Sequence, residues 1–218
     1  MKSEFSKRFF SSIILTPLVL FLIFLGSPML DYFIFFCFII AIYEWYKMMT
    51  NKIFFIIGSV YLMFSFFSIL KIRNDIENGF LYVLIVLLIC ISTDVGGYLF
   101  GKILKGPKLT KISPNKTYAG SCGSYIFSIL VIKLIYSYEF FLLHNVNFEI
   151  KTIYFIIILS TTSQLGDITI SYFKRLSKIK NTGNIIPGHG GLLDRIDGMI
   201  FAYPIAFILL NYNFFKIL

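Results

Sequence analysis

Long apolar runs recur along this chain, and each approaches the roughly twenty residues that a helix needs to cross a lipid bilayer. Because the hydrocarbon core offers no water to peptide groups, such runs must be helical there. The sequence therefore predicts an all-α, polytopic integral membrane protein with one domain and about seven transmembrane helices, within a range of six to nine. We expect these helices over residues 9–25, 30–48, 53–70, 80–100, 118–136, 152–176 and 193–211.

Two segments leave the number of helices open. The run at 53–70 could instead form two short helices divided near Gly58 and Ser59, and residues 139–151 could form a loop or a short re-entrant piece. The second predicted helix is expected to end at the membrane interface, where Trp45 and Tyr46 would act as an aromatic anchor beside Glu44.

The composition and the placement of charge agree with a membrane protein. Hydrophobic residues make up 57% of the chain, whereas soluble domains are usually about 45–50% apolar. A net charge of +9 would suggest nucleic-acid binding in a soluble protein, but here the lysines lie in short loops, so we expect no nucleic-acid partner. With the N-terminus inside, the predicted inner segments hold 15 Lys and Arg residues and the outer ones 4. We therefore expect a multi-pass protein of the inner (plasma) membrane, with its polar loops facing the cytoplasm.

A polar block at residues 164–198 interrupts the apolar pattern near the C-terminus. Its first half is predicted to be helical, and one face of that helix carries a carboxylate, a hydroxyl and two cations: Asp167, Ser171, Lys174 and Arg175. Its second half contains turn formers that exclude a regular helix, and His189 lies there between two glycines. The chain then enters another apolar helix, whose first turns carry Asp194 and Asp197.

The side chains of this block suit phosphoryl or nucleotidyl transfer. Carboxylates from two segments can hold Mg²⁺, which takes its remaining ligands from water and phosphate oxygens. Backbone N–H groups at Gly190 and Gly191 can bind phosphate. The alternative is a cationic cytoplasmic loop that serves membrane topology alone. Four cations can neutralise a polyphosphate, namely Lys174, Arg175, Lys180 and Arg195.

A second polar stretch covers residues 92–120 and begins with Asp94, near the end of a predicted apolar helix. Removing such a carboxylate from water costs several kcal/mol, so it is a functional candidate unless it already lies in interfacial water. A tight turn with a cation and two hydroxyls then leads into the next helix; it contains Ser113, Lys116 and Thr117. We expect residues 92–200 to form the catalytic half of the domain.

These two stretches together resemble the phosphatidate cytidylyltransferase (CDP-diacylglycerol synthase) family. The signature of that family is roughly S-x-x-K-R-x4-K-D, a short gap, and P-G-H-G-G-x-x-D-R-x-D, and this chain follows it in order from Ser171 to Asp197. The family's D-x-x-A-Y-x-x-G and S-P-K-K-T-x-E-G patterns are matched from Asp94 to Gly101 and from Ser113 to Gly120. The chain departs from these patterns at Gly97, Asn115, Ala119, Ile170 and Asn181.

The resemblance implies a membrane nucleotidyltransferase that makes CDP-diacylglycerol and pyrophosphate from CTP and phosphatidic acid. The implied partners are these two substrates and the lipid bilayer, and a homodimer is left open. We expect Asp167 and Asp194 to hold Mg²⁺, and the presence of a second cation is left open. The implied catalytic residues are Asp167, Lys174, Arg175, His189, Asp194 and Asp197. The implied substrate contacts are Asp94, Ser113, Lys116, Thr117, Ser171, Lys180, Gly190, Gly191 and Arg195.

Two other functions remain as alternatives. A transporter or channel would explain acidic residues and glycines in membrane helices, with Asp94 and Asp167 on its pathway, but it gives no reason for the ordered signature. A CDP-alcohol phosphatidyltransferase would need a D-G-x2-A-R spacing, which this sequence lacks.

Overall fold

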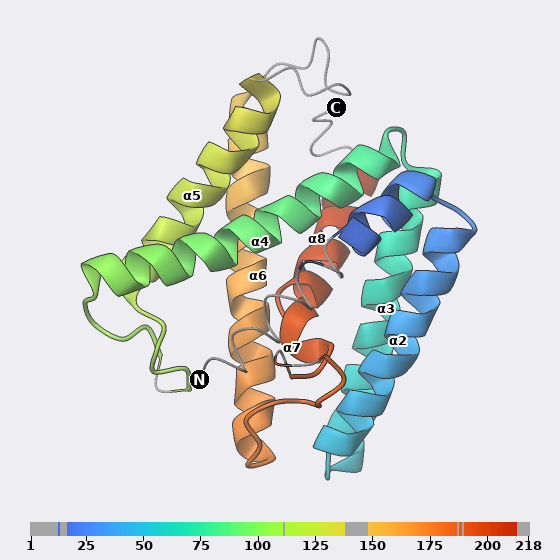
Figure 1. The fold of residues 1–218 in the computed structure, drawn as a ribbon, viewed down its shortest axis with the longest axis vertical. Helices are drawn as coiled ribbons and strands as arrows, with labels where there is room; N and C mark the ends of the chain where they lie inside the picture. The colour runs from blue at the N-terminus through green and yellow to red at the C-terminus, as the bar shows by residue number, and fades with distance from the viewer. Residues whose placement is uncertain are drawn as a thin grey trace.

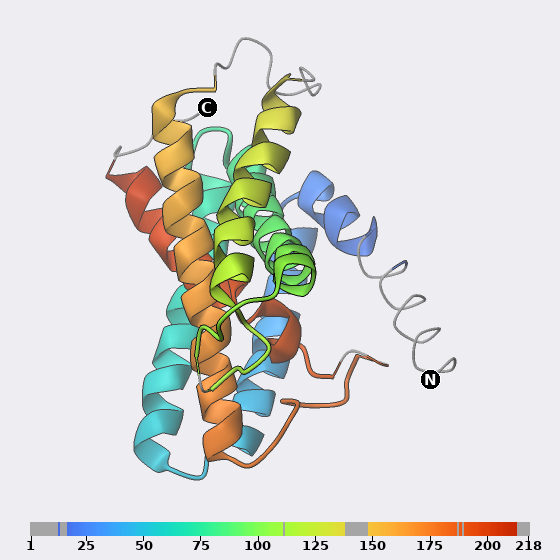
Figure 2. The same cartoon turned by 90° about the vertical axis from the view of Figure 1, so that its left-hand side faces the viewer.

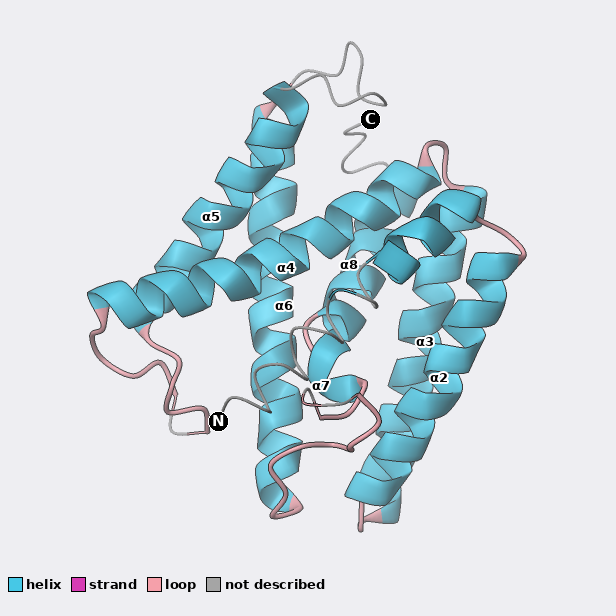
Figure 3. Ribbon diagram, in the orientation of Figure 1, coloured by secondary structure: helices cyan, strands magenta, loops and turns pink. Residues whose placement is uncertain are grey.

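The computed structural model of the chain describes residues 13, 17–110, 112–137, 148–186, 188 and 190–212. Within these residues every regular secondary-structure element is a helix (Figure 3). The only β-type pairings there are two isolated bridges, Lys108 with Thr117 and Ile186 with Gly190. The named helices are α2 (Met29–Met48), α3 (Lys52–Asp75), α4 (Gly79–Leu104), α5 (Tyr118–Ser137), α6 (Ile150–Leu176), α7 (Leu193–Ile196) and α8 (Met199–Asn211).

Five of these helices are long and apolar enough to cross a membrane: α2, α3, α4, α5 and α6. Helix α8 is also apolar but has only 13 residues. Many large hydrophobic side chains on the outer faces are exposed, as expected of surfaces that contact lipid tails. The prediction of an all-α polytopic membrane protein is therefore confirmed. Of the first predicted helix, residues 13 and 17–25 are helical, and residues 9–12 and 14–16 lie outside the described residues.

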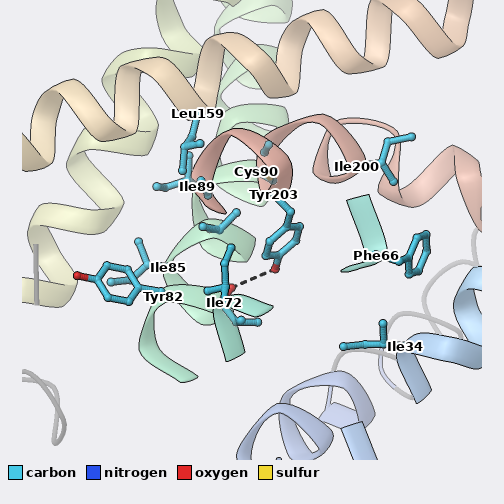
Figure 4. Close-up of a cluster of buried hydrophobic side chains, with 14 of the residues drawn as sticks. Ile34, Phe66, Ile72, Tyr82, Ile85, Ile89, Cys90, Leu159, Ile200 and Tyr203 are labelled. Atoms are coloured by element: carbon cyan, nitrogen blue, oxygen red, sulfur yellow. Dashed lines mark hydrogen bonds between the residues drawn. The ribbon is translucent and has the colours of Figure 1, made fainter. Parts of the chain in front are cut away.

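The helices pack around α4 and α8. Helix α4 crosses the molecule obliquely and packs closely against α5, while α8 lies between α3 and α6 (Figure 1). Buried side chains of α3, α4, α6 and α8 form the core between them, and the Tyr203 hydroxyl donates a hydrogen bond to the Val83 carbonyl oxygen at 3.1 Å (Figure 4).

Several predicted boundaries differ from those observed. The third helix is continuous, as predicted, so the alternative of two short helices divided near Gly58 is excluded. Helix α3 extends beyond its predicted end at residue 70 to Asp75, where Lys71 pairs with Asp75 at 2.7 Å. Helix α4 continues four residues beyond its predicted end at Phe100, and the last predicted helix is interrupted between α7 and α8. The Asp197 carboxylate accepts the Gly198 N–H there at 2.9 Å, and the backbone nevertheless stays in the α region.

The prediction of an aromatic anchor at the membrane interface is wrong for Trp45, one of its two residues. Trp45 is only 3% exposed, donates from Nε1 to the Phe55 carbonyl oxygen and packs against the Phe173 ring at 5.1 Å. The Trp45 side chain therefore belongs to the protein core, whereas Tyr46 is exposed. The hydroxyl of Ser177 donates to the Met48 carbonyl oxygen at 2.7 Å, so the C-terminal ends of α2 and α6 lie together.

The basic loops lie toward one end of the molecule. The described residues of the loops at 49–51, 105–117 and 177–192 lie toward the lower end of the view in Figure 1, and Figure 2 shows the loop after α4 passing along α6. That these segments share one side of the membrane stays a prediction.

Candidate active site

A pocket of about 280 Å³ lies between α4, α5, α6 and the loop that joins α4 to α5. The ammonium of Lys116 forms an ion pair with Asp167 Oδ2 at 2.5 Å, which joins this loop to α6. The pocket thus brings together residues of the two motif stretches that the sequence separates by about fifty positions. Its lining includes the predicted substrate-binding residues Asp94, Ser113, Lys116 and Thr117, together with Asp167.

Two carboxylates of the pocket lie well before the ends of their helices. Asp167 precedes the last residue of α6 by nine positions, and Asp94 precedes the last residue of α4 by ten. At 1.5 Å per residue, both carboxylates are roughly 14–15 Å from these helix ends. Asp167 therefore lies where the predicted range 152–176 places it, whereas Asp94 lies farther from its helix end than predicted, because α4 continues to Leu104 beyond the predicted end at Phe100.

The loop between α4 and α5 is fixed by its own hydrogen bonds. The Leu109 N–H donates to the Lys116 carbonyl oxygen at 2.8 Å, and the Lys116 N–H donates to the Ser113 carbonyl oxygen at 3.1 Å. The Thr117 hydroxyl oxygen accepts the Gly120 N–H at 3.0 Å, so it caps the start of α5. These contacts hold Lys116 toward α6, and they give Thr117 a structural role in addition to its place in the pocket lining.

Small polar side chains line the inner part of the pocket between the helices. The Thr93 hydroxyl donates to Ser160 Oγ at 2.9 Å, and Ser121 Oγ donates to Gln164 Oε1 at 2.5 Å. Ser124 Oγ donates to the carbonyl oxygen of Thr93 at 2.7 Å. These residues are not among those predicted from the sequence, although polar side chains at helical spacing within apolar runs, 121 with 124 and 160 with 164, are a usable signal.

Three carboxylates beside the pocket lie near enough to repel one another electrostatically. Asp197 is buried, and it interacts electrostatically with both Asp94 and Asp167. A Cβ added to Gly166 would lie 2.7 Å from the Asp197 carbonyl oxygen, so glycine allows the start of α8 to contact α6. Lys116 and the exposed Arg195 oppose the repulsion at Asp94. The result is an acidic cluster, formed by Asp94, Asp167 and Asp197, with cations around it.

Asp194 lies in a second polar group, between α6 and the loop that follows it. Its Oδ1 accepts from Lys174 Nζ at 2.8 Å, and the two side chains are 6% and 13% exposed, respectively. Its Oδ2 accepts the backbone N–H groups of Thr182 at 2.8 Å and Gly191 at 3.0 Å. Burial alone would raise the pKa of Asp194, but the bond from Lys174 and those from the Gly191 and Thr182 amides outweigh it and hold the pKa below its ordinary value.

The remaining predicted residues lie around these two groups. Ser171 Oγ donates to Asp167 Oδ1 at 3.2 Å, as the helical spacing of the stripe requires. Gly190, with a φ of 90°, and Gly191 are buried. Arg175 and Lys180 are exposed. His189 lies outside the described residues, as does Pro187.

The donor set fits Mg²⁺ chemically, because that ion prefers carboxylate oxygens. Among the described residues, no group of three or more His, Cys, Asp or Glu side chains is arranged to hold a metal ion. Both oxygens of Asp194 already accept hydrogen bonds from protein donors. The assignment of Asp167 and Asp194 as a metal-binding pair therefore stays a prediction, and Asp194 would have to release donors to join such a site.

Glu44 is a buried acidic residue that sequence analysis assigned only to the membrane interface. It is 1% exposed, and its carboxylate accepts the Thr182 hydroxyl and two backbone N–H groups at the start of α7. The sequence does mark Glu44 as a candidate functional residue, because an acidic residue inside an apolar run is as unusual at position 44 as at Asp94.

The fold and the pocket define an integral membrane protein with an acidic, lysine-containing site recessed among its helices. The chain belongs to the cytidylyltransferase family, which matches residues 50–213. The resemblance inferred from the motifs is thereby confirmed, and the enzyme interpretation is favoured over the transporter.

Several similar proteins bear the name phosphatidate cytidylyltransferase. The protein of Rickettsia bellii is 36% identical over 214 residues, which cover 95% of this chain and 91% of the relative. The protein of Rickettsia conorii is 35% identical over 217 residues, covering 97% and 93%. The protein of Bacillus subtilis is 38% identical over 158 residues, which cover 71% of this chain and 56% of that longer relative.

Proposed function

We propose that this chain transfers a cytidylyl group from CTP to phosphatidic acid, which yields CDP-diacylglycerol and pyrophosphate. The single observation that carries the proposal is the meeting of the two motif stretches at the Lys116–Asp167 ion pair, in a chain of the cytidylyltransferase family. The names of the similar proteins supply the lipid substrate.

The reaction needs no nucleophilic side chain, because phosphatidate brings its own anionic oxygen. That oxygen forms a bond to the α-phosphorus of CTP, the bond from the α-phosphorus to the bridging oxygen of the β-phosphate breaks, and pyrophosphate leaves with the electron pair. The residues must therefore bring two anions together and stabilise the charge that develops on the leaving group. We assign this role to Lys116 at the pocket and to Lys174 beside the following loop, together with Arg175, whose side chain is exposed.

A divalent cation, when bound, would supply further neutralisation of the triphosphate. Asp167 is the residue we assign to hold Mg²⁺, because it faces the pocket and its charge is repelled by those of Asp94 and Asp197, a repulsion that a cation would relieve. Asp194 is the second assigned ligand, and to bind the metal its carboxylate must give up some of the hydrogen bonds that it accepts in this structure.

The position of the pocket suits one soluble and one membrane substrate. A nucleotide can approach from the end that carries the basic loops, whereas a lipid can approach laterally between helices. We therefore assign the protein to the inner (plasma) membrane, with these loops in the cytoplasm where CTP is present.

The test uses purified protein in detergent with phosphatidic acid, Mg²⁺ and CTP labelled in the cytidine ring. The proposal predicts label in the lipid extract, and it predicts none when diacylglycerol replaces phosphatidic acid. Release of labelled CMP from CDP-diacylglycerol in the presence of an alcohol, without incorporation from CTP, would instead identify the phosphatidyltransferase alternative. Absence of lipid-soluble label in every arm would overturn the proposed function.

A further inference from the structure

The buried carboxylate of Glu44 joins α2 to both ends of a segment 138 or more residues away. Its Oε2 accepts the Thr182 hydroxyl at 2.8 Å and the Leu193 N–H at 2.9 Å, and its Oε1 accepts the Leu192 N–H at 2.9 Å. We call residues 177–192 the signature loop. Thr182 lies near its beginning, and Leu192 is its last residue, so one side chain fastens its two ends.

Asp194 closes the same loop from the opposite side. It accepts the Thr182 N–H and the Gly191 N–H, and the Thr182 hydroxyl lies 3.2 Å from its Oδ2. Thr182 therefore contacts both carboxylates, so the hydrogen bonds of Glu44 help to fix the position of Asp194. Because Asp194 forms an ion pair with Lys174, the Glu44 hydrogen bonds also connect this loop to the last turn of α6.

The space around Glu44 supports a specific fit rather than incidental burial. A Cβ added to Gly183 would lie 2.7 Å from Glu44 Oε1, and one added to Gly191 would also collide with the carboxylate. The signature loop thus approaches Glu44 at two glycines that leave room for it. The three donors described are a hydroxyl and two amides, so the carboxylate is stabilised by hydrogen bonds that a neutral amide side chain cannot all replace.

We propose that Glu44 is a positioning residue, which clamps the signature loop so that Asp194 and Lys174 are held in place for turnover. Glu44 lies before the segment that matches the family, which begins at residue 50. The clamp itself follows from the hydrogen bonds, and its effect on turnover rests on the proposed function. Glu44 acts through Thr182 and α7, and it does not touch the reacting atoms.

The test compares Glu44→Gln with the wild-type protein by hydrogen–deuterium exchange and by kinetics. Glutamine has a single acceptor oxygen, and its NH₂ group would face at least one N–H donor. We expect exchange at the Leu192 and Leu193 amides to accelerate about tenfold or more. We also expect kcat/KM for CTP to fall at least about tenfold, with a raised KM in the folded fraction, whereas a merely structural role would lower only the amount of folded protein.

Ser177→Ala is the matched control, because Ser177 also joins the ends of α2 and α6 but lies outside the clamp. Its loop exchange and its KM for CTP should stay near those of the wild type. Glu44→Asp, which keeps the acceptor oxygens on a shorter side chain, should retain more activity than Glu44→Gln. If Glu44→Gln does not fold, Thr182→Val removes one of the three donors, and Thr182→Ser restores it.

The outcomes separate the clamp from the proposed reaction. Wild-type exchange rates in Glu44→Gln, or in Thr182→Val if that variant is needed, would overturn the clamp. Faster exchange with unchanged kinetics would overturn its role in turnover. Wild-type protein without activity would overturn the proposed function, while faster loop exchange in the variant would still support the clamp, because that measurement uses no substrate.

Discussion

Asp194→Asn should abolish most turnover, and the structure gives the size of the effect. The carboxylate is 6% exposed and pairs with Lys174, which is 13% exposed, so water screens this ion pair poorly. Removing one member of a buried pair costs about 3–5 kcal/mol, because the other charge is left uncompensated. Asparagine also presents an NH₂ group where Asp194 now accepts two backbone N–H groups.

If the catalytically competent arrangement loses this free energy, kcat falls by a factor of roughly 10²–10⁴. The assay is the steady-state kcat of purified protein, with the thermal midpoint in detergent measured alongside. Lys174→Met and the double variant complete a double-mutant cycle, in which we expect a coupling free energy above about 1 kcal/mol. A coupling near zero, together with more than a tenth of the wild-type kcat in Asp194→Asn, would refute the reasoning.

Three further perturbations test other parts of the account. Arg175→Lys keeps the charge but loses the planar, bidentate guanidinium, so kcat/KM should fall several-fold or more. Lys178→Arg, which lies outside the polar face formed by Asp167, Ser171, Lys174 and Arg175, should behave as wild type. Equal kinetics in the two variants would mean that these cations serve membrane topology alone. A cysteine placed at Lys105 should resist a membrane-impermeant thiol reagent added to intact cells, and one at Glu77 should react; the reverse pattern would invert the proposed orientation. Thr117→Ala removes the cap of α5 and should destabilise the protein by about 1 kcal/mol, which Thr117→Ser should recover; an unchanged unfolding midpoint in the alanine variant would contradict the capping role.

The sequence predicted the helices and much of the pocket because both follow local patterns. Apolar runs identify the membrane helices, since lipid requires internal backbone hydrogen bonds. The i, i+4 spacing correctly places Ser171 beside Asp167. The motifs brought Lys116 and Asp167 into one predicted site, although no local pattern specifies that these two residues form an ion pair.

What the sequence did not reveal depends on tertiary packing. The predicted helix at 80–100 ends with its apolar run, whereas α4 continues to Leu104, so Asp94 lies farther from its helix end than expected. The donors to Asp194 and Glu44 are largely backbone N–H groups, which every residue has and which therefore leave no mark in the sequence. Glu44 was assigned to the interface because Trp45 and Tyr46 follow it, but Trp45 is buried by aromatic contacts from distant segments.

The most direct test of the central claim is a double-label assay of the wild-type protein beside Asp167→Asn. CTP would carry one label in the cytidine ring and another in the γ-phosphate, in detergent with phosphatidic acid and Mg²⁺. We predict equal amounts of cytidine label in the lipid and of γ-label in pyrophosphate for the wild type. We also predict a loss of both labels by more than about tenfold in a folded Asp167→Asn variant, because Lys116 and the assigned metal site would lose their shared carboxylate. Unequal labels in the wild type, or near wild-type turnover by the variant, would contradict the account.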